Sequence, residues 1–233
     1  MTELEKLQKH IVRCRLCPRL VQWREKIAIE KTRRFEHWQY WGKPNPSFGD
    51  PEAQLLLVGL APAAHGGNRT GRMFTGDRSG DWLYRALHKF GFANQSTSVS
   101  RHDGLRLQNC YITATCRCAP PQNRLLPAEI VNCRPFLIKE MEILNSVRVI
   151  VGLGKIGFDS AVSALRHLGA WTVSSKLHFT HGAEYPITNK LTLLASFHPS
   201  QQNTFTGRLT EPMFDAIFRR ARKLLLTSDS LRT

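Results

Sequence analysis

The sequence predicts an α/β fold, a three-layer α/β/α arrangement around a central, mostly parallel sheet of four strands. Two observations lead to this prediction. Four short apolar runs alternate with helical segments along the chain. Each run is continuously apolar rather than alternating, which is typical of parallel strands covered on both faces. The 233 residues suffice for one full core, so we expect a single domain over 1–233.

The expected elements follow in chain order. Residues 1–50 are rich in charge and aromatic rings and predict a helix followed by an irregular, proline-ended wrap. The predicted strands are 54–58, 109–115, 147–151 and 191–195. The predicted helices are 81–90, with Gly91 just past its end, then 127–144 with a restart at Pro135, then 155–168 and 211–225.

The chain is strongly basic. It has 33 Lys and Arg against 18 Asp and Glu, a formal net charge of +15. A field of that sign concentrates polyanions, so nucleic acid is the favoured partner, and a merely solvated basic surface is the alternative. The sequence shows no apolar run of membrane-span length, no basic amphipathic helix and no signal-peptide pattern. We therefore expect a cytoplasmic protein with no membrane partner.

Unusual loops follow all four predicted strands. The first, 59–77, is long, rich in glycine and basic, which suits an anionic ligand, and the others span 116–124, 152–157 and 196–203. In an open parallel sheet, ligands bind outside the carboxyl ends of the strands. The sequence therefore predicts an active site at this edge.

One of these loops imitates a dinucleotide-binding fingerprint. Gly152, Gly154 and Gly157 form a G-x-G-x-x-G run that follows a strand and opens a helix. The run lies at the third strand rather than the first, and no acidic residue ends a strand about twenty residues later. We expect no nicotinamide or flavin, although the amides of this helix start, with Lys155, suit a nucleic-acid phosphate.

The six cysteines predict a metal site before disulfides. Cys14 and Cys17 form a C-x2-C pair, and Cys118 and Cys133 supply two further thiols. Four thiolates suit either zinc or an iron–sulfur cluster, and the spacing does not choose between them. The remaining two, Cys110 and Cys116, are interpreted as buried thiols.

His198, at the end of the fourth strand, is the strongest single candidate for catalysis. The alternative interpretation of His198 is a surface histidine that caps a turn. The alternative interpretation of Asp77 is a residue of an ordinary turn that leads into the next helix. Together with Phe74 and Asp77, however, His198 forms a set suited to a flipped base, which it can stack, hydrogen-bond and release from its sugar.

Two long motifs carry a family resemblance. Residues 59–77, GLAPAAHGGNRTGRMFTGD, resemble the first motif of the uracil-DNA glycosylase superfamily, and 198–208, HPSQQNTFTGR, resemble its second. The residues of both motifs are similar to those of family 5, the type B enzymes of bacteria and archaea, which are related to the family 4 iron–sulfur enzymes. The resemblance implies a uracil-DNA glycosylase-like fold over 1–233 and a cytoplasmic, nucleoid-associated repair enzyme.

The resemblance also implies roles for individual residues. Phe74 matches the ring that stacks on the extrahelical base, and His198 matches the histidine that faces the base carbonyl. The residues that match ligands of a structural [4Fe–4S] cluster are Cys14, Cys17, Cys118 and Cys133.

Two positions depart from the superfamily pattern. Ala61 stands where family 1 has a water-activating Asp, and Ala114 stands where family 4 has the Asn that reads uracil. We therefore assign the water-directing role to Asp77, with Asn123 as the other candidate. We further expect Gly59, Ala61 and Ala114 to border the base. The expected DNA-backbone contacts are Asn68, Arg69, Lys155, Ser200, Gln201 and Arg208, and Arg72 belongs to the same basic loop.

These expectations describe a monomeric glycosylase that acts on double- and single-stranded DNA containing deaminated bases. It flips uracil or another deaminated base, hydrolyses the N-glycosidic bond and leaves an abasic site. A broad substrate range is expected because Ala114 has no side-chain donor or acceptor. The alternative function is a non-enzymatic nucleic-acid-binding protein with an iron–sulfur or zinc site.

Overall fold

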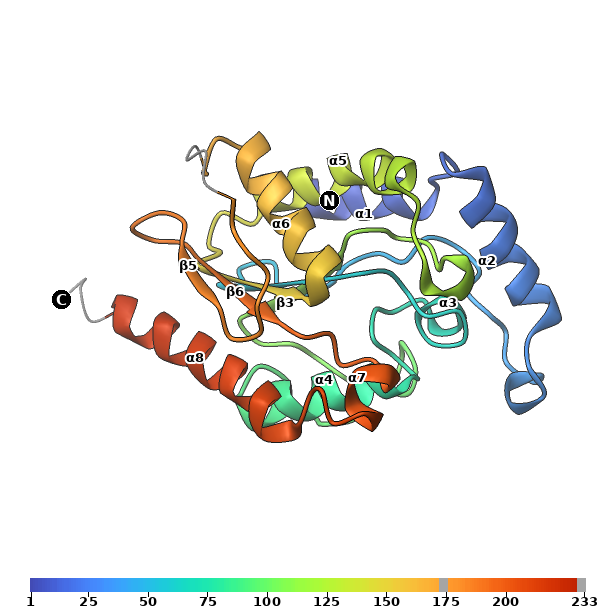
Figure 1. Ribbon diagram of the computed structural model, residues 1–233. Coiled ribbons are helices and arrows are strands. Elements are labelled where there is room, and N and C mark those ends of the chain that lie inside the picture. Colours follow the sequence, from blue (N-terminus) through green and yellow to red (C-terminus); the bar gives the residue numbers. More distant parts are fainter. Residues whose placement is uncertain (172–175, 230–233) are drawn as a thin grey trace.

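The computed structural model describes residues 1–171 and 176–229 and contains a six-stranded mixed sheet (Figure 1). The strand order is β1-β3-β2-β4-β6-β5. Four strands pair in parallel: β2 (Leu55–Gly59), β3 (Cys110–Ala114), β4 (Val149–Leu153) and β6 (Thr192–Ser196). Two short strands, β1 (Phe48–Gly49) and β5 (Glu184–Pro186), pair antiparallel at the two edges.

The predicted fold class is confirmed, with two strands added. The four parallel strands lie within two or three residues of their predicted bounds. The edge strands β1 and β5 were not predicted, because two or three half-exposed residues carry no apolar periodicity.

Helices cover both faces of the sheet. The longer ones are α1 (Glu3–Val12), α2 (Pro18–Glu30), α4 (Arg78–Lys89), α5 (Pro127–Ile143), α6 (Gly154–His167) and α8 (Glu211–Asp229). The shorter ones are α3 (Gly67–Thr70), α7 (Gln201–Phe205) and the 3-10 turns η1 (Arg33–Phe35) and η2 (Pro121–Asn123). In Figure 1, α4 and α8 lie below the sheet, and α1, α5 and α6 lie above it. None of the helices in the described ranges has the length and apolar composition that a membrane crossing needs.

Three helix predictions need correction. The N-terminal section contains two helices, α1 and α2, rather than one. The predicted restart at Pro135 is wrong, since α5 continues through it. The one acceptor that Pro135 leaves without a helical donor belongs to Val131, an exposed residue whose carbonyl can turn to water. Helix α4 starts at Arg78 rather than at 81, because Asp77 caps it.

The central strands are buried on both faces, as their continuous apolar pattern predicts. Leu55 and Leu57 of β2 pack into one core cluster with α4 and α8. Leu56 and Val58, which point to the other face, pack into a second cluster with α5 and α6. Both clusters exclude water from the sheet, which fixes the register of every strand.

The parallel strands end at one level. Gly59 of β2 pairs with Ala114 of β3, and Leu153 of β4 pairs with Ser196 of β6. The loops that follow these residues therefore start side by side along one edge of the sheet. This confirms the predicted convergence of the four loops.

The G-x-G-x-x-G run has a packing explanation. A Cβ atom on Gly152 would lie 2.5 Å from Cα of Phe158, and one on Gly157 would lie 2.3 Å from the carbonyl oxygen of Val58. Both glycines let α6 lie directly on the sheet. Gly154 has φ +81°, a left-handed conformation that favours glycine.

We predict that Gly157→Ala lowers the free energy of unfolding by roughly 1–3 kcal/mol, the usual cost of overpacking, because the added methyl group meets rigid backbone. Urea unfolding followed by circular dichroism measures the change. His167→Ala, in the exposed last turn of the same helix, is the matched control and should stay within about 0.5 kcal/mol of the wild type. Equal stability of both variants would contradict the packing explanation.

Candidate active site

Phe74 and His198 form a stacked ring pair at the carboxyl edge of the sheet. Their ring centroids lie 5.8 Å apart with an interplanar angle of 29°. The Phe74 ring and the His198 backbone each lie against a glycine: a Cβ atom on Gly59 would lie 2.9 Å from Cζ of Phe74, and one on Gly154 would lie 3.1 Å from Cβ of His198. The structure thus brings together Gly59, Phe74 and His198, three residues that the sequence predicted for one site.

Phe74 also has an unusual backbone. Its φ of 52° lies in the left-handed region, which non-glycine residues seldom adopt. The conformation is held by its surroundings, since Tyr84 donates a hydrogen bond to the carbonyl of Met73 at 2.9 Å. Gly80 lies against the Phe74 carbonyl so closely that a Cβ atom there would meet its oxygen. Such local strain concentrates at functional sites.

His198 is neutral at physiological pH. Burial lowers the pKa of its imidazole from 6.5 to about 4, because desolvation disfavours the charged form. The loop that carries it is fixed by Asn203, whose side-chain amide donates to the His198 carbonyl at 2.8 Å. Ser200 caps helix α7 by accepting a hydrogen bond from the Asn203 backbone. A neutral ring that is half-buried can donate one hydrogen bond without carrying a charge.

Asp77 is the N-cap of α4, as the turn interpretation predicted. Its Oδ1 atom accepts a hydrogen bond from the backbone of Gly80 at 3.0 Å. Its Oδ2 atom faces Gly66, where an added Cβ would lie only 2.0 Å from that oxygen. Burial raises the pKa of the Asp77 carboxyl. Asp77 therefore holds α4 with one oxygen and turns the other toward the loop after β2.

The two alanines occupy the strand ends as predicted. Ala114 is the last residue of β3, is 1% exposed and pairs with Gly59. Ala61 lies two residues beyond β2 and is half-buried. Asn123 lies in η2, is exposed and has φ +56°.

Asn68 and Arg69, which the sequence predicted as phosphate contacts, have internal partners in this structure. These side chains are 1% and 3% exposed. Asn68 donates through Nδ2 to the carbonyl of Arg24 at 3.1 Å. The Arg69 guanidinium donates to the carbonyls of His65 and Gly76, at 2.7 and 3.0 Å. It also lies 3.9 and 4.1 Å from the ring centroids of Phe35 and Trp38, a cation–π arrangement inside the protein.

Arg72 is likewise an internal residue. It is 4% exposed and forms an ion pair with Asp103 at 2.7 Å. The pKa of Asp103, which also accepts hydrogen bonds from Arg72 and three backbone amides, is lowered to about 2. The basic residues of the loop therefore hold its shape instead of facing a ligand.

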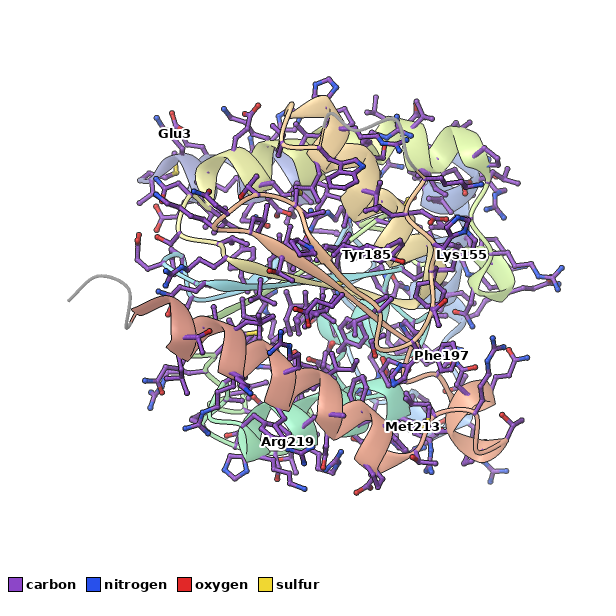
Figure 2. The ribbon with its side chains drawn as sticks, turned by 60° about the vertical axis from the view of Figure 1, so that its left-hand side comes forward. Glu3, Lys155, Tyr185, Phe197, Met213 and Arg219 are labelled. Atoms are coloured by element: carbon purple, nitrogen blue, oxygen red, sulfur yellow. The ribbon has the colours of Figure 1, made fainter. Side chains whose placement is uncertain are left out.

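The other predicted DNA contacts differ in exposure. Lys155, Gln201 and Arg208 are exposed, and Ser200 is the half-buried cap of α7. Lys155 forms an ion pair with Asp159, and Arg208 lies over the Phe197 ring at 4.7 Å. Figure 2 shows Lys155 and Phe197 at the same end of the sheet. The exposed side chains of Lys155, Gln201 and Arg208 can meet a polyanion at the active-site edge.

The four predicted cluster cysteines line one cavity. Cys14 and Cys17 reach it from the segment between α1 and α2, Cys118 from the loop after β3, and Cys133 from α5. Within the described part of the chain, no three His, Cys, Asp or Glu side chains are arranged to hold a metal ion. Cys110 and Cys116 are fully buried, in agreement with their interpretation as core thiols.

Sequence reasoning missed Arg24. This residue of α2 is 2% exposed, and its guanidinium reaches the cysteine cavity. One of its nitrogens lies 2.7 Å from Sγ of Cys118. A charged residue in a helix with ordinary polar neighbours gives no sequence signal for burial, so only the tertiary structure could find it.

Comparison with known proteins identifies the family. The sequence model of the uracil DNA glycosylase superfamily matches residues 46–222, so the chain belongs to that superfamily. A type-5 uracil-DNA glycosylase of Mycobacterium leprae is 50% identical over 95% of this chain and 95% of its own length. One of Thermus thermophilus is 49% identical over 91% of this chain and 93% of its own length.

These relatives place the chain within the type-5 uracil-DNA glycosylases. A type-4 uracil-DNA glycosylase of Sulfurisphaera tokodaii is more distant, at 26% identity over 66% of this chain and 56% of its own length. Both the superfamily and the type-5 resemblance predicted from the motifs are confirmed.

We predict that His198 titrates far below an ordinary histidine. Its pKa in the folded protein lies near 4, against 6.5 when unfolded. Between these values the unfolded chain binds a proton that the folded chain does not. The stability contribution of His198 is therefore complete above pH 6.5 and is lost as the pH falls toward 4. Histidine NMR titration, with His198→Gln to assign the resonance, measures the pKa. A midpoint near 6.5 would contradict the desolvated site.

Proposed function

We propose that this chain is a uracil-DNA glycosylase of base excision repair, a hydrolase acting on N-glycosyl bonds. It removes uracil and other deaminated bases from double- and single-stranded DNA and leaves an abasic site. The observation that carries this function is the Phe74–His198 ring pair, an aromatic surface beside a neutral hydrogen-bond donor. The membership of the chain in the type-5 group supports the same activity.

The base first leaves the duplex. A base inside the stack cannot be reached, so the enzyme must extrude it and read its edge while an aromatic side chain stacks on its face. Phe74 supplies this ring. Its strained backbone and its contact with Gly59 hold the ring rigidly at the end of β2.

His198 acts when the glycosidic bond breaks. Positive charge develops on the sugar and negative charge on the departing base, as in other glycoside hydrolysis. A neutral imidazole that donates a hydrogen bond to the base oxygen stabilises that negative charge, as an oxyanion donor does. Desolvation strengthens the interaction, since the surrounding dielectric is low.

Asp77 acts on the water that attacks the sugar. Its Oδ1 atom is held by the helix cap, which leaves Oδ2 toward the loop after β2. A carboxylate there orients the attacking water and offsets the positive charge of the sugar. Its raised pKa increases its basicity toward water. Asn123 is the other candidate for this water-directing role.

Binding to the DNA backbone is driven by charge. The net charge of +15 attracts the strand, and counterion release makes the affinity fall with salt. With Asn68 and Arg69 buried, the phosphate contacts in this proposal come from Lys155, Gln201 and Arg208. The enzyme acts as a monomer.

The cysteine cavity holds a structural [4Fe–4S] cluster in this proposal. The thiols fit such a group, because all four line one cavity and the buried Arg24 guanidinium faces them. Through Cys14, Cys17, Cys118 and Cys133, such a cluster would link the N-terminal helices to the loop after β3 and to α5.

We predict that Asp77→Asn slows uracil excision by about a hundredfold or more, the usual contribution of a positioned base. Asparagine caps a helix as well as aspartate does, so α4 should remain intact and the rate should report the carboxylate alone. Single-turnover rates on a uracil duplex, with thermal unfolding as the control for α4, make the measurement.

Wild-type activity of Asp77→Asn would leave Asp77 as a cap and move the water-directing role to Asn123. Asn123→Ala is the matched variant for that outcome.

His198→Ala should lose about a hundredfold in rate while DNA affinity changes little. A wild-type protein that binds DNA but excises no uracil would instead support a non-enzymatic binding protein.

We predict a broad substrate range that depends on Ala114. A site that reads a base through a side-chain amide rejects analogues that leave the amide unpaired, and Ala114 has no such group. The wild type should therefore excise hypoxanthine as well as uracil, and mismatched bases faster than matched ones. Ala114→Asn should lower the ratio of the hypoxanthine rate to the uracil rate. Both rates are measured on one preparation, so their ratio does not depend on the fraction of folded protein. Strict uracil specificity in the wild type would refute the argument.

A further inference from the structure

Arg24 touches two of the four predicted cluster ligands. Its Nη1 atom donates to Sγ of Cys118 at 2.7 Å, and its Nη2 atom donates to the backbone carbonyl of Cys14 at 3.3 Å. Cys14 lies in the N-terminal section before α2, and Cys118 lies in the loop after β3. One guanidinium therefore bridges the N-terminal section and the sheet.

The charge of Arg24 lacks a close carboxylate. Its nearest one is Glu25, whose Oε1 atom lies 3.8 Å from Nη2. Glu25 is half-exposed and is already held by both terminal nitrogens of Arg15, at 2.5 and 3.1 Å. The Nε atom of Arg24 is buried without a hydrogen-bond partner. A nearby anion stabilises a buried cation. The cavity that Arg24 faces also contains Glu129 and Arg117, but these are paired with Arg19 and Glu140, and the other ionisable groups that line it are the four thiols.

The neighbouring buried arginines are satisfied differently. Arg117 is 1% exposed and forms an ion pair with the buried carboxylate of Glu140. Arg72 has Asp103 in the same way. Arg69 is buried and donates to backbone carbonyls, as Arg24 does. Arg24 differs from all three in that its guanidinium also donates to a thiol sulfur.

We propose that Arg24 is the counter-charge of the [4Fe–4S] cluster, which retains the cluster and raises its reduction potential. The inference rests on the cofactor part of the proposed function. An iron–sulfur cluster bound by four thiolates carries net negative charge, and one-electron reduction by an external donor adds another. A cation and an N–H donor at a ligand sulfur stabilise the reduced form more than the oxidised form.

The test compares three variants of the full chain, purified without oxygen. Arg24→Gln removes the charge, Arg24→Lys keeps the charge without the planar fork, and Lys26→Gln is the control. Lys26 lies on the same helix, with 59% of its side chain exposed, and pairs with Glu30. Iron and acid-labile sulfide are counted, iron release to a chelator is timed, and the cluster is titrated with redox mediators.

Arg24→Gln should release iron about tenfold faster than the wild type and be about tenfold harder to reduce, which is about 59 mV for one electron. Arg24→Lys should fall between Arg24→Gln and the wild type, and Lys26→Gln should match the wild type. A cluster lost from Arg24→Gln during purification, with Lys26→Gln fully loaded, also supports the role. Wild-type iron release and potential in Arg24→Gln would overturn it.

The outcomes separate this inference from the proposed function. Stoichiometric zinc without sulfide in the wild type would overturn the cluster and with it the role of Arg24, whatever the excision rate. Uracil excision by the same preparations is assayed independently. A protein that carries the cluster but excises no uracil would refute the glycosylase and leave the Arg24 comparison intact.

Discussion

The level ends of the four parallel strands are the constraint on which the site depends. Val58 pairs with Gly152, and Leu153 pairs with Ser196. The strands β2 and β6, which lie on either side of β4 and precede Phe74 and His198, therefore end at the same level. A slip of one residue in any strand would turn its buried side chains to the opposite face. The two core clusters prevent that slip, so the hydrophobic burial of the sheet also sets the distance between the two rings.

Burial at this edge then sets the electrostatics. The imidazole of His198 stays neutral although the chain as a whole is strongly cationic, because desolvation lowers its pKa. The same effect raises the pKa of Asp77. The reacting base therefore meets a neutral donor, while the exposed positive charge attracts DNA. Two basic residues of the first loop, Arg69 and Arg72, add little to the exposed charge because they interact with internal partners.

The sequence was informative where a pattern has one physical meaning. Continuous apolar strands, the loops after them and the cysteine spacing predicted the fold and the place of the site. It was ambiguous where one residue type has two uses: Asn68 and Arg69 suit phosphate, and in this structure their side chains donate to buried carbonyls. Arg24 gave no signal at all. Its carbonyl accepts a hydrogen bond from Asn68, and its guanidinium donates one to Cys118. Arg24 therefore joins the cysteine cavity to the loop after β2 through contacts that only the folded chain creates.

The most direct test is a crystal structure with a duplex that carries a 2′-fluoro uracil nucleotide, whose fluorine destabilises the sugar cation and slows cleavage. The account predicts uracil outside the helix, stacked on Phe74, with a base oxygen within hydrogen-bond distance of a His198 ring nitrogen. An unflipped base, or a uracil bound away from the Phe74–His198 pair, would contradict it.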